Sequence, residues 1–193
     1  MPAMAVGQRG RPRAFSHDAA LRAAVDLFWR QGYASTSLDD LLRTMGISRS
    51  SFYAAWASKH EVLMAALRLY TDELHGRMRA AAAGAGDARA ALAAVLEVAA
   101  CSERPADGCL FVNTATELAS SDADVCALAH EHLGRVDRLI ASLFRDAGFP
   151  APIARRRSVA LLALAAGAVT LRKAGEPEAR IRAVLETLPL LLA

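Results

Sequence analysis

Apolar residues recur at helical spacing along most of the chain, and no segment shows the alternation expected of a strand. One short stripe, over residues 38–45, consists of Leu38, Leu41, Leu42 and Met45. Ser37 precedes this stripe and Asp40 stands three residues after Ser37, which is the arrangement of a capping box. Gly46 then supplies a residue that readily takes the left-handed backbone that ends a helix. The pattern predicts a short capped helix followed by a tight turn.

A second short helix is predicted directly after this turn, over residues 49–56. Ser48 is placed to cap it, and Phe52 and Trp56, four residues apart, share a face suited to packing. Polar side chains lie towards its N-terminal end: Arg49, Ser50, Ser51 and Tyr53. Two short helices joined by a tight turn form a helix-turn-helix, whose second helix enters the DNA major groove. Small hydroxyls and an arginine suit contacts with base edges and phosphates there.

Three segments of this region resemble the TetR (tetracycline-repressor) family of bacterial transcriptional regulators: GYASTS, DDLLRTMGIS and SFYAAWASKHEVL. The resemblance is strong over about residues 15–65 and extends over the rest of the chain in layout. Tyr53, Trp56 and Lys59 match the usual end of the family's recognition helix. Ala55 stands where that pattern usually has a His, so the phosphate contact made by that His is not expected here.

The resemblance implies a homodimer, an all-helical ligand-binding domain and release from double-stranded operator DNA when a small-molecule effector binds. The DNA-binding residues expected by analogy are Ser37, Ser48, Arg49, Ser50, Ser51, Tyr53 and Lys59. Among them, Arg49, Ser50 and Ser51 are expected to approach bases. The residues expected to hold phosphates are Ser37, Tyr53 and Lys59.

The chain is therefore predicted to be all-α, with about nine helices. Residues 1–14 are expected to form a flexible basic arm, residues 15–65 a three-helix helix-turn-helix DNA-binding head, and residues 66–193 a larger ligand-binding and dimerisation domain. The other helices are expected over about 16–31, from Lys59 to about 83, after Asp87, and over 109–119, 122–147, 153–174 and 178–192. Ser120 or Ser121 is the expected cap of the helix over 122–147, and Gly175 the expected end of the helix over 153–174.

Composition agrees with a folded DNA-binding protein. The 193 residues are 54% hydrophobic and 22% charged, which suits one large or two small globular domains. The net charge is only +3, yet residues 1–60 hold eight Lys or Arg against four Asp, as phosphate binding requires. In the arm, Arg9 to Arg13 resembles an AT-hook core, which lies in a narrow A·T minor groove. The alternative is a solvated tail in which Arg11 and Arg13 make only nonspecific phosphate contacts.

The chain begins without the apolar segment of a signal peptide, and its longest uncharged apolar run, 158–171, is too short to span a bilayer. A cytoplasmic protein with no membrane partner is expected. Its three cysteines are an odd number, so a disulfide framework is not expected.

The helix over 153–174 is apolar almost all round after its first turn, and such a helix must be covered on every side. Its small residues permit close approach of another helix. We therefore expect a homodimer interface formed by the helices over 153–174 and 178–192. The alternative is a central helix buried within a monomer.

The helix over 109–119 carries a polar strip formed by Cys109, Asn113, Thr116 and Glu117. This strip is the predicted ligand-binding surface, with a solvated helix face as the alternative. Cys109 begins the helix, where backbone N–H groups and the helix dipole stabilise a thiolate. GCLFVN also resembles a segment of family members that sense reactive compounds through a cysteine.

No metal site, cofactor or enzymatic activity is predicted. Cys126 and His130 are one turn apart, but His132 faces elsewhere and no second pair lies close; solvent-facing histidines are expected instead. No catalytic motif is present. The predicted function is a repressor released from its operator by a small, largely apolar ligand. Two alternatives remain open: a thiol-based electrophile or redox sensor acting through Cys109, and an architectural DNA-binding protein without an effector.

Overall fold

The computed structural model describes residues 16–100 and 104–193. Within these ranges there are nine helices of seven or more residues, two shorter helical turns and no strand. The elements are α1 (His17–Gln31), α2 (Leu38–Met45), α3 (Arg49–Ala55), α4 (Lys59–Ala83), α5 (Ala88–Ala100), the 3₁₀ turn η1 (Pro105–Asp107), α6 (Leu110–Leu118), α7 (Ala123–Asp146), α8 (Ala151–Lys173), α9 (Glu178–Leu185) and α10 (Leu188–Leu191). The all-α prediction is confirmed. The expected arm, with Arg11 and Arg13, lies outside the described residues, as does Cys101.

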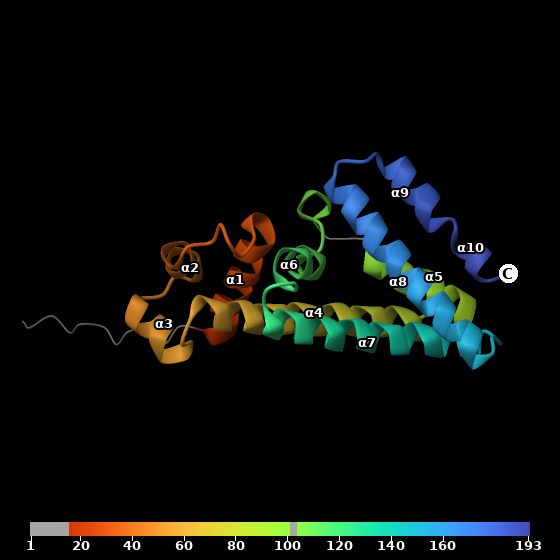
Figure 1. The fold of residues 1–193 in the computed structure, drawn as a ribbon, viewed down its shortest axis with the longest axis horizontal. Coiled ribbons are helices and arrows are strands. Elements are labelled where there is room, and N and C mark those ends of the chain that lie inside the picture. The colour runs from red at the N-terminus through yellow and green to blue at the C-terminus, as the bar shows by residue number, and fades with distance from the viewer. Residues whose placement is uncertain (1–15, 101–103) are drawn as a thin grey trace, which may run out of the picture.

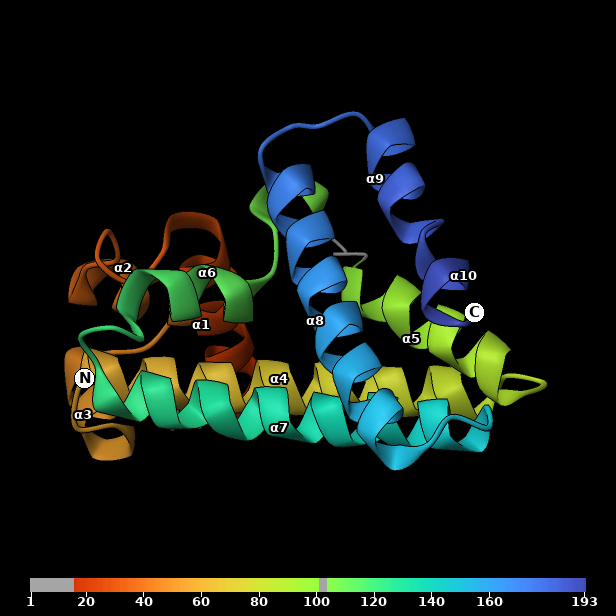
Figure 2. The same ribbon diagram turned by 45° about the vertical axis from the view of Figure 1, so that its right-hand side comes forward.

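The short helices α1–α3 form a head at one end of an elongated molecule, and α4 runs from that head into the remaining helices (Figure 1). α7 lies alongside α4, and α8 crosses both while contacting α5, α7 and α9 (Figure 2). α6 is short and lies where α1, α4 and α7 meet. The head, with which the first turns of α4 are counted, and the remaining helices, here called the body, are therefore joined by α4 and by the neighbourhood of α6.

Local sequence explains the helix ends in the head. Ser16 Oγ accepts from the Ala19 N–H at 3.3 Å, and the Ser37 and Asp40 side chains form the predicted capping box of α2. Gly46 ends α2 in the left-handed region, at φ 67° and ψ 31°, and Ser48 caps α3. Each of these signals is contained within a few residues, so the sequence predicted them correctly.

A continuous apolar core runs from the head into the body. Leu41 and Phe52 are fully buried in the head, and α4 contributes the equally buried Leu63 and Leu67. Because α4 packs against α1 as well as against α5 and α7, it completes the core of the head and belongs to the body too. The domain boundary near residue 65, which falls inside α4, stays a prediction.

Three helix ends differ from the prediction. Asp122, rather than Ser120 or Ser121, caps α7, because its Oδ1 accepts from the N–H groups of both Asp124 and Val125 at 3.0 Å. α8 begins at Ala151, since Pro152 falls in the first turn, where a missing N–H costs no hydrogen bond. The helix expected over 178–192 is two helices, because Pro189 has no N–H to continue α9.

No described helix combines the length and the hydrophobicity needed to cross a bilayer.

Candidate nucleic-acid interface and adjoining cavities

Helix α3, the predicted recognition helix, has one buried and one exposed side. Phe52 is fully buried and packs against the buried Trp56, with ring centroids 5.9 Å apart. Arg49 and Ser50 are exposed, and Tyr53 is 54% exposed although its ring meets Phe52 edge-on. The side chains expected to meet DNA therefore lie on the outward face of a helix that its own aromatic residues anchor.

The capping serines hold the N-termini of α2 and α3. Ser37 Oγ donates to Asp40 Oδ2 at 2.6 Å and accepts from the Asp40 N–H at 3.1 Å. The Ser37 hydroxyl and then the Ser37 backbone N–H, which both donate to the Asp40 carboxylate, lower the pKa of Asp40 and keep this carboxylate ionised. Ser48 Oγ accepts from the Ser51 N–H at 3.1 Å and lies 2.9 Å from the Ser50 hydroxyl. Both serines thus present helix N-termini, which favour phosphate anions.

Arg49 lies at the first position of α3 and reaches back to α2. Its Nη2 donates to Asp39 Oδ1 at 2.6 Å, and both side chains are largely exposed. Exposed ion pairs of this kind contribute little stability. Arg49 can therefore leave Asp39 for a base edge at small cost.

Lys59 has a structural position in the unbound protein. Its Nζ donates to the carbonyl oxygens of Tyr33 at 3.0 Å and Thr36 at 2.8 Å, and it lies 4.0 Å from the centroid of the Tyr33 ring. An ammonium group has three N–H donors, and two of them hold the turn between α1 and α2. The expected phosphate contact of Lys59 stays a prediction.

The polar strip of α6 meets the end of α1. Asn113, Thr116 and Glu117 line a cavity of about 400 Å³ together with residues at the end of α1 and Lys173 of α8. Asn113 donates to the Asp107 carbonyl at 2.7 Å and accepts from Lys173 Nζ at 2.8 Å. Asn113 therefore already bonds to neighbouring elements, whereas Thr116 donates only to carbonyls of α6 itself. The ligand-binding role of the strip stays a prediction.

Glu117 connects α6 directly to the head. Its Oε1 accepts from the Ala34 N–H at 2.8 Å and its Oε2 from the Tyr33 N–H at 3.1 Å. Both N–H groups belong to the turn between α1 and α2. The prediction placed Glu117 in a ligand site but missed this contact, which joins residues 83 and 84 positions apart.

Further contacts join the body to the head. The Trp29 indole N–H donates to the Gly108 carbonyl at 3.2 Å, and Arg104 pairs with Asp26 at 2.8 Å. His60, near the start of α4, lies 2.9 Å from the carboxylate of Asp122, the cap of α7. Together with Glu117, these residues fix the body against three parts of the head.

Cys109 is buried at the N-cap of α6, with 6% of its surface exposed, and its side chain makes no capping hydrogen bond. The Tyr70 hydroxyl donates to its Sγ at 3.3 Å. Burial, followed by the nearby Cys109 thiol, raises the pKa of Tyr70, so the hydroxyl remains a donor. Cys109 is not among the residues that line the cavity next to α6.

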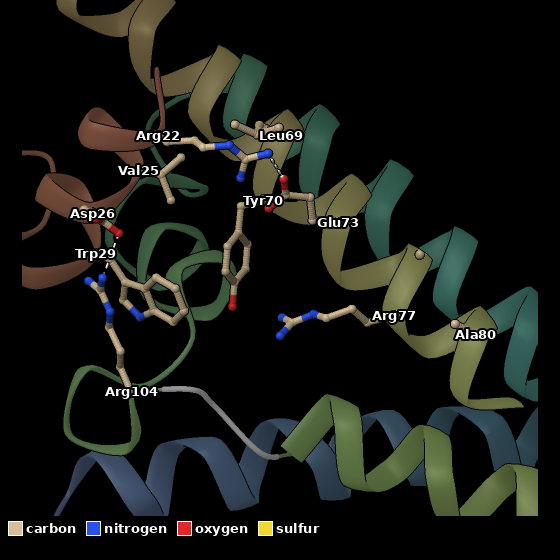
Figure 3. Close-up of a pocket in the computed structure, with 11 residues that line it drawn as sticks. Arg22, Val25, Asp26, Trp29, Leu69, Tyr70, Glu73, Arg77, Ala80 and Arg104 are labelled. Carbon is tan, nitrogen blue, oxygen red and sulfur yellow. Dashed lines mark hydrogen bonds and ion pairs between the residues drawn. The ribbon is translucent and has the colours of Figure 1, made fainter. Parts of the chain in front are cut away.

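A larger cavity, of about 670 Å³, opens between α1, α4 and Arg104 (Figure 3). Its lining consists of Arg22, Val25, Asp26, Trp29, Leu69, Tyr70, Glu73, Gly76, Arg77, Ala80 and Arg104. This cavity was not predictable from the sequence, because its walls come from three segments that only the fold brings together. The one feature of the sequence that could have indicated it is the pair of polar residues Glu73 and Arg77, four positions apart on one side of α4.

The histidines of α7 do not form the solvent-facing pair that was expected. His130 is exposed, but His132 is buried against Phe111, with ring centroids 4.5 Å apart. Burial, and then the charge of Arg135, lower the pKa of His132 to about 4. Residues 16–100 and 104–193 contain one group of three possible metal ligands whose ligand atoms lie within 4.8 Å of one another: His60, Asp122 and Asp124. Cys126 is not part of this group.

Two family models match the sequence. One is described as "Bacterial regulatory proteins, tetR family" and matches residues 20–66; the other is described as "Transcriptional regulator LmrA/YxaF-like, C-terminal domain" and matches residues 85–187. The HTH-type transcriptional repressor ComR of Escherichia coli (strain K12) is 34% identical over 122 residues, which are 61% of this chain and 58% of ComR. The HTH-type regulator YezE of Bacillus subtilis (strain 168) is 26% identical over 119 residues, 60% of this chain and 61% of YezE. The matched segment thus spans less than two thirds of either relative.

Solved structures resemble the chain over almost its whole length. A cysteine mutant of the TetR family transcriptional regulator CifR, complexed with 26-base-pair operator DNA, superposes with a TM-score of 0.78 at 33% identity, over 92% of this chain and 97% of CifR. The reduced form of E. coli NemR superposes with a TM-score of 0.74 at 19% identity, over 91% of this chain and 96% of NemR. The second likeness concerns the fold alone.

Proposed function

The chain belongs to the TetR family of bacterial regulatory proteins, and we propose that it is a DNA-binding transcriptional repressor that uses α3 to read its operator. One observation carries this proposal: Arg49, Ser50 and Tyr53 are exposed on α3 in the fold in which CifR is complexed with operator DNA. Members of this family are transcriptional regulators rather than enzymes. A regulator that binds DNA also fits the cytoplasmic location expected from the sequence.

We propose that the repressor is a homodimer formed through α8, α9 and α10. One side of α8 packs on the body, whereas the opposite side exposes Val159 at 61% and four small residues at helical spacing, Ala160, Ala163, Ala166 and Gly167. Leu190 in α10, within the segment 178–192 of the expected interface, is 75% exposed. A second copy would cover this apolar side with the same surface, as twofold symmetry requires.

We further propose that a small effector releases the operator by shifting the body against the head. The contacts between body and head involve Glu117, Trp29, Asp26 and His60. A ligand that favours a different arrangement of these contacts changes the separation of the two recognition helices and weakens DNA binding. The proposed ligand has a small, largely apolar and aromatic body. A gel shift of operator DNA, repeated with a panel of such compounds, tests this step.

Replacing Glu117 by Gln should loosen the turn between α1 and α2. The neutral amide offers one acceptor oxygen in place of two charged ones, so the N–H groups of Tyr33 and Ala34 lose protection. We expect their hydrogen exchange to accelerate by about tenfold or more. Operator affinity should also fall, because the two heads of the dimer are then held less firmly at the separation that the operator requires.

The matched control is Glu97→Gln, at an exposed glutamate of α5. It should leave both measurements at wild-type values. Unchanged exchange at residues 33 and 34 in Glu117→Gln would show that the carboxylate does not hold the turn.

The thiol-sensing alternative is not favoured, since an alkylating agent has little access to Cys109. Brief treatment with N-ethylmaleimide followed by mass spectrometry should modify the half-buried Cys126 before Cys109. Release from the operator should not accompany the first modification. If Cys109 is labelled first, and Cys109→Ser abolishes release by the reagent, the thiol sensor replaces the reversible ligand.

A further inference from the structure

A further cavity lies on the body, where α4 and α7 run side by side (Figure 2). Its volume is about 300 Å³, at the lower end of the range of small-molecule sites. Its lining consists of His75 and Arg79 from α4 and of Arg135, Arg138 and Leu139 from α7. This cavity, here called the arginine groove, therefore gathers basic side chains from two helices and has no carboxylate in its lining.

Two of the arginines in this lining have no acidic partner. Arg135 pairs with Asp72, so its charge is offset. Arg79 and Arg138 are exposed, and neither forms an ion pair or a hydrogen bond with any residue that the structure describes. Gly134, one turn before Arg138, has no side chain, and a Cβ there would lie 3.4 Å from Nη1 of Arg138. The guanidinium group of Arg138 therefore lies against the surface of α7, next to the groove, with its N–H donors unused.

The histidine of the groove lies in the field of these arginines. Nη2 of Arg135 is 3.3 Å from Nδ1 of His75. Burial, and then the charges of Arg135 and Arg79, lower the pKa of His75. The ring is therefore neutral near pH 7, and the positive charge of the groove comes from its arginines.

We propose that the arginine groove binds a small anion that carries two phosphate groups, one held by Arg79 and the other by Arg138. A guanidinium group presents five N–H donors in a planar fork that matches phosphate oxygens. The two arginines stand on different helices, and the axes of packed helices lie about 8–10 Å apart. A diphosphate therefore reaches both arginines more readily than a single phosphate does. A carboxylate would satisfy one arginine and leave the other without a partner.

The position of the groove separates this site from the DNA-binding face. At a rise of about 1.5 Å per residue, Arg79 lies about 30 Å along α4 from Lys59, which opens that helix. The phosphates of DNA held by α3 are therefore far from the groove, and a separate small anion is the occupant that we assign. The assignment does not depend on the effector proposed above.

The test is a calorimetric titration of the full chain with inorganic pyrophosphate and, separately, with orthophosphate, at one ionic strength and without divalent cations. The variants of the groove are Arg79→Gln and Arg138→Gln. Arg30→Gln is the matched control, because it removes an equal charge from an exposed position on α1 that does not line the groove. Circular dichroism checks that each variant keeps the helical content of the wild-type chain.

We expect one pyrophosphate to bind per chain, more tightly than orthophosphate. Each variant of the groove should raise the Kd of pyrophosphate about three- to tenfold, whereas Arg30→Gln should leave it unchanged. Absence of saturable binding at millimolar pyrophosphate, equal affinity for the two anions, or an equal loss in Arg30→Gln would each overturn the site.

A gel shift of operator DNA distinguishes this site from a DNA contact. Without pyrophosphate, Arg79→Gln and Arg138→Gln should hold the operator as tightly as the wild-type chain does. If both variants weaken operator binding and the wild-type chain binds no pyrophosphate, the groove contacts the DNA backbone and the assignment of a small anion is wrong. Neither result changes the role assigned to α3, because the two arginines lie outside that helix.

Discussion

Gly167→Leu should convert the protein from a dimer into a folded monomer that no longer holds its operator. Gly167 lies on the exposed side of α8, and a Cβ there would meet no atom within 4 Å of the same chain. Leucine also favours the helix over glycine by about 0.8–1 kcal/mol, so the fold of the single chain should not suffer. Between two copies, however, its side chain would hold helices apart that small residues otherwise allow to approach closely.

Loss of the dimer should reduce operator affinity by about 10²–10⁴-fold, because two linked heads bind far more tightly than one. Analytical ultracentrifugation and a gel shift on the same preparation measure both effects. Gly76→Leu, at a helical glycine of α4 with equally open surroundings, serves as the control and should sediment as a dimer. A wild-type chain that sediments as a monomer at micromolar concentration, or a Gly167→Leu variant that remains a dimer, would contradict the assigned interface.

Arg49→Ala should reduce the preference for the operator over other DNA. At the first turn of α3, an arginine can donate two hydrogen bonds to a guanine edge, which alanine cannot replace. The expected loss on the operator is about 1–3 kcal/mol, with a smaller loss on scrambled DNA. Because the Arg49–Asp39 pair is exposed, the fold should tolerate the change.

The measurement is the ratio of Kd values for scrambled and operator DNA at one salt concentration. Arg43→Ala removes an exposed arginine from α2 and should leave that ratio at its wild-type value. A wild-type ratio in Arg49→Ala would show that this side chain does not read bases.

Local signals made the head predictable from the sequence. The capping box of Ser37 and Asp40, the left-handed Gly46 and the cap at Ser48 each depend on residues within a few positions of one another. The burial of Phe52 and Trp56 follows from their spacing on one face of a helix. The predicted helices in the head therefore agree with the structure to within a residue or two.

The contacts between head and body were not predictable in the same way. Glu117 was assigned to a ligand surface, but its carboxylate binds two N–H groups in the turn between α1 and α2. His132 was expected to face solvent, yet packing against Phe111 buries it. The cavity between α1 and α4 also depends on pairs such as Arg22–Glu73, which are distant in sequence. Helical periodicity shows which face of a helix is apolar but not which element covers it.

The most direct test is footprinting of the wild-type full chain on the DNA that flanks its own gene. We expect one protected site with two related half-sites about 34–36 Å apart on the same face of the duplex, one for each α3. We also expect Arg49→Ala to give no protection at the protein concentration at which the wild-type protein saturates this site. Binding no tighter than to scrambled DNA of equal length and composition, at the same salt, would contradict the claim that this protein is an operator-binding repressor.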